Sequence, residues 1–347
     1  MSFLKKTGKA VADLIPGVGK LTFDDNVGKV FITSGTGVIG YRVALSLLEA
    51  GHKNVRVGVW MGERQTETSG ADESLASKVK RALEEKGAEV IDFDWANPNT
   101  HKEAVSGVNT VFCTLPHMES WAEVFPNFLT VCKDMKVEHF IKISFLRDLE
   151  GSDKYRENVP FVRFHSTCDD LLEMAPRTSR ISYTILCASH LMSTPLLHQG
   201  PLLREDHKFI TASYGMGINY VSPNDVADCA VVCIMNQKAH RNKIYNLTGS
   251  GPITDDAIAK LLSQFYGTEI EHIQMGYHAY KRSLKERGLP EWLVKDSAEF
   301  ERMKASGSDE RPGAYTKDIE KLTGNKPETF KDYLTNKSCM RPGLTFP

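Results

Sequence analysis

A glycine-rich turn between an apolar strand-like run and a helical pattern constrains this chain more than any other feature. The run Val30-Phe31-Ile32-Thr33 leads into Ser34-Gly35-Thr36-Gly37-Val38-Ile39-Gly40, and apolar residues at helical spacing follow. Where a strand turns sharply into a helix, the first backbone N–H groups lack helical partners and the positive end of the helix dipole faces outward. Glycines let a diphosphate approach such a backbone without meeting a Cβ. The turn therefore predicts a dinucleotide site, because G-x-G-x-x-G stands here between a strand and a helix.

The chain after this turn alternates between strand-like and helical segments. Strands are expected at residues 30–33, 55–60, 89–93, 110–114, 139–144 and 183–187, and helices at 38–50, 74–86, 100–105, 121–136 and 165–174. Gly51 and Gly87 stand where helix C-caps belong. Continuous apolar strands that alternate with helices are typical of a parallel sheet covered on both faces. We therefore predict the α/β class, with a doubly wound parallel Rossmann sheet.

The pattern changes after residue 188, where prolines and glycines interrupt the chain. Helices are expected after caps at Ser222 and Thr254 and over residues 277–287 and 292–304, with a strand at 244–247. We expect these segments to form a smaller C-terminal substrate lobe over the carboxyl ends of the strands. The predicted division is a short N-terminal arm (1–28), an NAD(P)-binding Rossmann domain (29–190) and a mixed lobe (191–347) whose chain returns to the sheet.

Composition excludes several classes of protein. The 347 residues carry a formal net charge of -1 without a block of like charge, so no nucleic-acid partner is expected. The longest strongly apolar stretch, residues 229–235, is too short for a membrane span of about 20 residues. Seven cysteines without C-x-x-C spacing, and histidines without ligand spacing, predict reduced thiols and no metal site. The cytoplasm is the expected compartment, with organellar targeting left open.

These landmarks occur in an order that resembles the NmrA-like family of atypical short-chain dehydrogenase/reductases, over roughly residues 29 to 335. The matching segments are the glycine-rich turn and the stretches 47–57, 87–98, 108–114, 182–186 and 245–249. The resemblance implies that the chain binds NADP or NAD. It also implies one of two roles, reduction of quinones and related acceptors or redox sensing without turnover.

The resemblance also assigns positions in the cofactor site. The pyrophosphate would lie against Ser34, Gly35, Thr36, Gly37, Val38, Ile39 and Gly40. Asp94 and Trp95 would lie near the adenine, and Thr114, Leu115 and Pro116 would line the nicotinamide side. Ser144, which closes the fifth strand, would face the active cleft.

The chain departs from the family pattern near the site. Trp60 stands where a basic residue usually closes the second strand, so Arg64 is the candidate partner of a 2′-phosphate and Trp60 could stack on the adenine. NADP is slightly favoured over NAD on this basis. Cys187-Ala188 replaces an Arg-Pro pair, and Cys168 occupies a position where an acidic residue follows the family's helix-opening histidine, here His165. We read Cys168 as a buried packing residue, and these changes leave turnover open.

The usual acid–base pair of short-chain dehydrogenases, Tyr-x-x-x-Lys, is not where it is expected. The motif occurs once, from Tyr277 to Lys281 in the lobe, and is read as an ordinary helix surface. Tyr155 lies in the expected region but has no lysine four residues later.

The candidate proton donors are His117, His165 and Ser144. His117 follows the fourth strand and is either a cleft histidine or a solvated loop residue. His165 matches the family's cleft histidine, and His190 could also face the cleft. Met192, Tyr214, Met216 and Tyr220 could line an apolar pocket, although lobe core is favoured.

Two functions follow from these observations. The first is an NAD(P)H-dependent oxidoreductase that transfers hydride to a quinone-like or related apolar small-molecule acceptor. The alternative is a non-catalytic NAD(P)-binding redox sensor or a structural subunit of a larger assembly. In that alternative, the amphipathic N-terminal arm is a candidate docking segment for a protein partner.

Overall fold

The computed structural model describes residues 27–61, 74–119, 121–147, 158–311 and 313–336. Residues 1–26 of the predicted N-terminal arm lie outside the described residues, as do Arg64 and Tyr155. Within the described ranges, no helix is long and apolar enough to cross a membrane.

Seven strands form one parallel sheet in the order β10-β6-β5-β4-β1-β2-β3. Their bounds are β1 Val30–Ile32, β2 Val55–Val59, β3 Glu89–Asp92, β4 Thr110–Cys113, β5 His139–Phe145, β6 Ser182–Ala188 and β10 Lys243–Leu247. Val30 of the central strand lies opposite Val55 on one side and Thr110 on the other. The predicted Rossmann sheet is therefore confirmed, and the order reverses beside β1, where such folds bind ligands.

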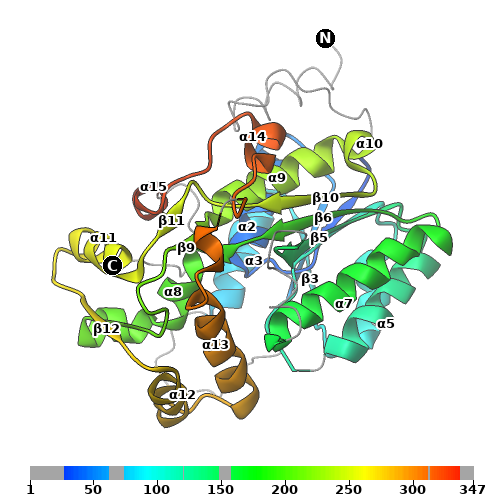
Figure 1. Cartoon of the computed structure of the whole chain (residues 1–347). Helices are drawn as coiled ribbons and strands as arrows, with labels where there is room; N and C mark the ends of the chain where they lie inside the picture. Colours follow the sequence, from blue (N-terminus) through cyan, green and yellow to red (C-terminus); the bar gives the residue numbers. More distant parts are fainter. Residues whose placement is uncertain (1–26, 62–73, 120, 148–157, 312, 337–347) are drawn as a thin grey trace.

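Helices cover both faces of this sheet (Figure 1). One face is packed by α2 (Val38–Glu49), α3 (Leu75–Glu85), α9 (Pro223–Met235) and α14 (Asp318–Thr323). The other is packed by α4 (Pro98–Val105), α5 (Trp121–Asp134) and α7 (Pro160–Met174). Because both faces are buried, the strands are apolar without alternation.

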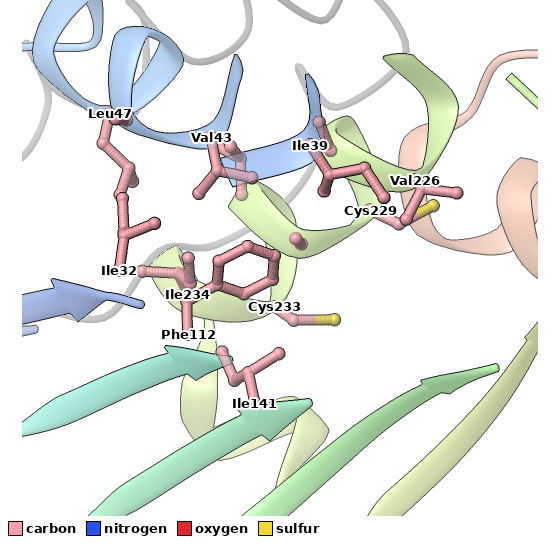
Figure 2. Packing of buried hydrophobic residues seen from close by; sticks show 14 of the residues in the cluster. Ile32, Ile39, Val43, Leu47, Phe112, Ile141, Val226, Cys229, Cys233 and Ile234 are labelled. Atoms are coloured by element: carbon pink, nitrogen blue, oxygen red, sulfur yellow. The ribbon is translucent and has the colours of Figure 1, made fainter. Parts of the chain in front are cut away.

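Apolar side chains fill the core between α2, α9 and the strands (Figure 2). Side chains from both helices meet those of the sheet in one cluster, which includes Ile32, Ile39, Val43, Leu47, Phe112, Ile141, Val226, Cys229, Cys233 and Ile234. This packing sets the position of the α2 N-terminus, which begins at the glycine-rich turn.

Capping residues begin three of the helices, and the sequence predicts two of these caps, Ser222 and Thr254. Ser74, Ser222 and Thr254 each accept a hydrogen bond from a backbone N–H in the first turn of α3, α9 and α11 (Asp255–Tyr266). Gly51 and Gly87 follow α2 and α3 with φ of 85° and 95°, a conformation that favours glycine.

The prediction that a helix opens at His165 is wrong, because α7 begins at Pro160. A proline fits the first position of a helix, where its missing N–H would have no partner, and Val159 before it is extended. The helical pattern over residues 160–164 was missed for this reason, and His165 lies in the second turn.

The remaining segments build the smaller lobe, at the left and lower side in Figure 1. They are β7 His190–Leu191, α8 Ser193–His198, η3 Leu202–Asp206, β8 Lys208–Thr211, β9 Ile218–Val221, β11 Pro252–Ile253, α11, β12 Glu271–Gln274, α12 Tyr277–Glu286, α13 Glu291–Lys304, η4 Ser308–Glu310 and α15 Phe330–Thr335. Two short helices lie outside this lobe: η2 Ala175–Arg177 follows α7, and α10 Gln237–His240 follows α9 beside the large sheet. Three strands pair as β11-β9-β7 and two as β12-β8. Between these lobe segments, α9 and β10 return the chain to the large sheet.

Candidate functional site

The glycine-rich turn fits tightly against the sheet. The Gly35 N–H donates to the Gly58 carbonyl oxygen at 2.8 Å. A Cβ on Gly35 would lie 2.5 Å from Val57 Cγ1, and one on Gly40 would lie 2.0 Å from the Ser34 carbonyl oxygen. Both positions therefore exclude a side chain, and they hold the start of α2 against the end of β1.

The N-terminus of α2 fits a diphosphate group. Gly37 is its N-cap and gives no side-chain hydrogen bond, and the first turn holds no acidic residue. Ser34, Thr36, Gly37 and Val38 are partly exposed, so the turn before α2 is open to solvent. A helix N-terminus of this kind combines free donors with the positive end of the dipole.

The residues predicted around the adenine lie in different surroundings. Trp60 closes β2 with 47% of its surface exposed. Asp94 is half-buried, and its carboxylate accepts from the Ala96 N–H at 2.8 Å. Trp95 is instead buried in the core, with its ring against Phe93 and Phe128. The structure therefore leaves Trp60 and Asp94 at the surface and places Trp95 in the core.

A cavity of about 300 Å³ lies at the carboxyl ends of the strands, beneath α13. It brings together most of the residues predicted for the nicotinamide side and the active cleft, namely Thr114, Leu115, His117, Ser144, His165 and His190. Ile39, which was predicted for the diphosphate turn, also borders it. Pro116 is exposed and is not part of this wall. The volume of the cavity is at the lower end of the range typical of small-molecule sites.

A buried charge cluster lies behind this wall. Lys142 is fully buried in β5, and its Nζ donates to Asp169 Oδ1 of α7 at 2.8 Å. The Ser144 hydroxyl donates to the other carboxylate oxygen of Asp169 at 2.5 Å. Arg147 lies 3.9 Å from the same carboxylate. Asp169 thus orients Ser144, whose proton is engaged with the carboxylate.

The same lysine fixes the state of His165. Lys142 Nζ lies 3.1 Å from His165 Nδ1, and an ammonium group can only donate. The pKa of His165 is held well below its usual value, first by burial and then by the charge of Lys142. The imidazole is therefore neutral, with its proton on Nε2.

His117 is held by a residue of the lobe. Its Nε2 is hydrogen-bonded to Asp296 Oδ2 of α13, and Asp296 is 2% exposed. The other oxygen of Asp296 accepts from the Phe161 N–H at 3.0 Å. His117 borders the cavity and also an outer groove between α5, α7 and α13, and its side chain is 27% exposed. It is the candidate donor with a route to solvent.

Sequence reasoning missed Lys142, Asp169 and Asp296. Lys142 is the only lysine, arginine or carboxylate within the strand-like run 139–144, which is a signal of a buried charge. Asp169 follows His165 by four residues, which places both on one face of a helix. Asp296 gave no signal, because only the tertiary structure brings α13 to His117.

The other sequence predictions have mixed outcomes. Cys168 is buried, and burial raises its pKa to about 12, so the predicted packing thiol is confirmed. The six cysteines within the described ranges are all buried and free. The Tyr277 hydroxyl donates to Glu299 on the lobe surface, away from the cavity. Met192 lies in the lobe core, Tyr214 is exposed and Tyr220 is buried.

The fold and the site together define a Rossmann protein whose glycine-rich turn at the α2 N-terminus fits a dinucleotide. The family model described as NAD(P)H-binding matches residues 35–237, more than half of the chain. The chain belongs to this NAD(P)H-binding oxidoreductase family, and the predicted NmrA-like membership is confirmed.

Individual relatives are distant but cover almost the whole chain. The prestalk A differentiation protein A of Dictyostelium discoideum is 24% identical over 309 residues, 88% of this chain and 90% of the relative. A NADPH-dependent quinone oxidoreductase from Escherichia coli, complexed with NADPH, superposes with a TM-score of 0.68 at 20% identity and covers 88% of this chain and 98% of its own. A Citrobacter triphenylmethane reductase complexed with NADP(H) has a TM-score of 0.67 at 20% identity, with 88% and 99% covered.

Proposed function

We propose that this protein is an NAD(P)H-dependent reductase that passes hydride to a flat, apolar, quinone-like acceptor. The cavity carries the proposal, because it joins the cofactor side to an aromatic pocket without a break. Ile39 and Thr114 border it at one end, and Phe145, Phe161 and Phe300 border it further in. An acceptor ring in this pocket lies beside the position expected for the nicotinamide.

Two solved relatives support the acceptor class. They are a quinone oxidoreductase and a triphenylmethane reductase. Both names indicate ring-containing acceptors, and the aromatic walls of this cavity suit the same shape.

The residues of this chain would hold the cofactor as follows. The partly exposed turn from Ser34 to Val38 binds the diphosphate, and Trp60 stacks on the adenine. Thr114, Leu115 and Ser144 border the nicotinamide. Bound reduced nicotinamide supplies a hydride, and Arg64 favours NADP over NAD as the partner of a 2′-phosphate.

His117 supplies the proton that accompanies the hydride. Asp296 keeps its imidazole oriented toward the cavity, and the outer groove gives the ring a path for reprotonation from water. A quinone that receives one hydride and one proton becomes a hydroquinone, so one donor is sufficient. His165, neutral with Nε2–H, can donate a hydrogen bond to the acceptor without losing its proton.

Binding and turnover are tested in sequence. We expect titration with NADPH and NADH to enhance nicotinamide fluorescence, with tighter binding of NADPH. NADPH consumption with a panel of quinones then measures turnover. Binding of neither nucleotide would contradict the proposal, and binding without turnover of any quinone would favour the redox sensor.

The role of His117 has its own test. We expect His117→Asn to lower kcat about 100-fold with little change in NADPH affinity, because positioned acid catalysis contributes that much. Asp296→Asn should lower kcat less and change the pH dependence of kcat. His278→Asn, on the exposed surface of α12, is the matched control. An unchanged kcat in His117→Asn would assign the proton to water.

A further inference from the structure

We propose that the inner end of the cavity recognises a neutral hydrogen-bonding group, a hydroxyl or carbonyl, on an otherwise apolar aromatic ligand. The recognising side chains are Lys304, His190 and Tyr280. This assignment rests on the proposed function only in taking the ligand to be the acceptor, since the binding site itself requires no turnover.

The inner end is distinguished by a second cavity of about 260 Å³ that shares its wall with the first. His190, His198, Tyr280, Glu301 and Lys304 line both cavities. Neither Ile39, Thr114 nor Ser144 lines the second cavity. The shared side chains therefore lie away from the cofactor side, where a ligand would place the part that does not react.

Lys304 is a fixed donor at this position. Its side chain is 13% exposed, and Nζ lies 2.7 Å from Glu301 Oε1 and 3.2 Å from the Tyr220 hydroxyl. Glu301 is held in turn, because its other oxygen accepts from the Ala212 N–H at 2.7 Å. An ammonium group has three donors, and the described residues use two of them. One N–H of Lys304 remains for a ligand.

His190 and Tyr280 add further polar groups without partners. The His190 ring nitrogens and the Tyr280 hydroxyl have no hydrogen-bond partner among the described residues. Both side chains line the cavity, and these polar atoms are not sealed from it by the protein. Polar atoms that face a cavity without a partner are costly unless water or a ligand satisfies them. They therefore indicate a polar contact at this end of the ligand.

The surrounding charges favour a neutral group over an anion. Glu301 compensates Lys304 directly, and the buried carboxylate of Asp255 adds negative charge nearby. The pKa of His190 is held well below its usual value by burial and by Lys304, so this ring is neutral. Arg287, at the exposed margin of the second cavity, donates to the His198 carbonyl oxygen at 3.3 Å. An anion would thus meet no uncompensated buried cation.

Aromatic rings form the apolar part of the site. The ring of His190 lies 5.4 Å from that of Phe145, 5.8 Å from Phe300 and 5.9 Å from Tyr220, measured between centroids. These separations are those of edge-to-face aromatic packing. The body of the ligand is therefore flat and apolar, with its polar group toward Lys304.

Three naphthalenes of one shape test this assignment in the full chain saturated with oxidised cofactor, at neutral pH. Naphthol carries a neutral hydroxyl, naphthoate a negative charge and methylnaphthalene neither. We expect calorimetric titration to give about tenfold tighter binding of naphthol than of either other compound, the value of one or two hydrogen bonds. Equal binding of naphthol and methylnaphthalene, tighter binding of naphthoate, or no binding of any compound would overturn the proposal.

Variants locate the polar contact. Tyr280→Phe should weaken naphthol about threefold to tenfold and leave methylnaphthalene unchanged, because only an unpartnered hydroxyl is removed. The double variant Glu301→Gln/Lys304→Met removes both charges together and should abolish the preference for naphthol. Lys295→Met, on the same helix but exposed in the outer groove, is the control and should change neither affinity. An unchanged preference in both the first two variants would place the hydroxyl elsewhere.

The outcomes separate the two proposals. Preferential binding of naphthol without turnover of any quinone supports the polar site and contradicts the reductase. Turnover of quinones without a preference for naphthol supports the reductase and contradicts the polar site.

Discussion

Lys142 is the residue whose position is the most demanding energetically. It is a cation with no exposed surface, and an unpaired charge in such a place costs several kcal/mol. Asp169 compensates it, and the carboxylate also orients Ser144. The lysine therefore serves the site indirectly, because its Nζ holds the Asp169 carboxylate in place and its charge helps to keep His165 neutral.

We expect Lys142→Met to reduce the free energy of unfolding by about 3–5 kcal/mol, because it leaves Asp169 buried without its main partner. Arg147 at 3.9 Å limits the loss. The double variant Lys142→Met/Asp169→Asn should recover most of it, as urea unfolding would measure. A single variant as stable as the wild type would mean that the buried pair contributes nothing.

The same substitution has a spectroscopic consequence. The positive charge of Lys142 lowers the pKa of His165, so its removal should raise that pKa. A pH titration of the His165 ring protons by NMR would measure the change. An unchanged pKa would show that the charge of Lys142 does not contribute to it.

At the scale of the element, the turn before α2 contains a glycine that the fold requires and a glycine that the fold does not require. A Cβ on Gly40 would meet the Ser34 backbone at 2.0 Å, so that position is required for folding. A Cβ on Gly37 would meet only the Ser34 hydroxyl, at 3.1 Å, and its φ of -76° suits any residue. Gly37 is therefore tolerant in the fold and exposed toward the expected diphosphate.

We expect Gly37→Ala to raise the Kd for NADPH at least about tenfold while the melting temperature changes little, because the new methyl group occupies the diphosphate side. Fluorescence titration and thermal unfolding measure the two effects. Gly251→Ala, where nothing lies within 4 Å of the added Cβ, is the control. Unchanged NADPH affinity in Gly37→Ala would remove this turn from the cofactor site.

The elements themselves were predictable where local chemistry decides them. Caps at Ser222 and Thr254 and the glycines after α2 and α3 gave boundaries that the structure confirms. The start of α7 was not predictable in this way, because proline there acts as a first helical residue. The short elements between residues 190 and 221 were also missed, since they are ordered by packing rather than by periodicity.

At the scale of the whole molecule, partly buried carboxyls connect α9 to distant segments. The Asp225 carboxylate accepts from the Glu328 N–H at 2.8 Å, and Asp228 lies 3.7 Å from Arg42 of α2. Burial raises the pKa of Asp225 to about 7 and that of Asp228 to about 6, with the Glu328 charge acting in the same direction. The folded chain therefore binds protons more tightly here than the unfolded chain does.

The sign of the resulting pH dependence follows from the raised pKa values. The stabilisation from proton binding at Asp225 is present in full below pH 3.8, the ordinary pKa of an aspartate, and is lost as the pH rises through about 7. As the pH rises from 3.8 to about 7, we expect the free energy of unfolding of the wild type to fall relative to that of Asp225→Asn. The fall is about 1.4 kcal/mol per pH unit at most. Unfolding at several pH values checks this, with the exposed Asp170→Asn as control. A constant difference between wild type and Asp225→Asn would contradict it.

The sequence by itself determined the strands, many helix boundaries and the dinucleotide turn, because a pattern in residues close along the chain marks each of them. The seven strands and the α2 N-terminus follow from apolar runs, caps and glycines. The tertiary structure alone decided which charges meet. Asp296 and His117 are separated by 179 positions in the sequence, and Lys304 and Tyr220 by 84. No local sequence pattern indicates a contact between residues so far apart along the chain. Cofactor binding was therefore predictable from the turn, whereas the acceptor site had to be found in the folded chain.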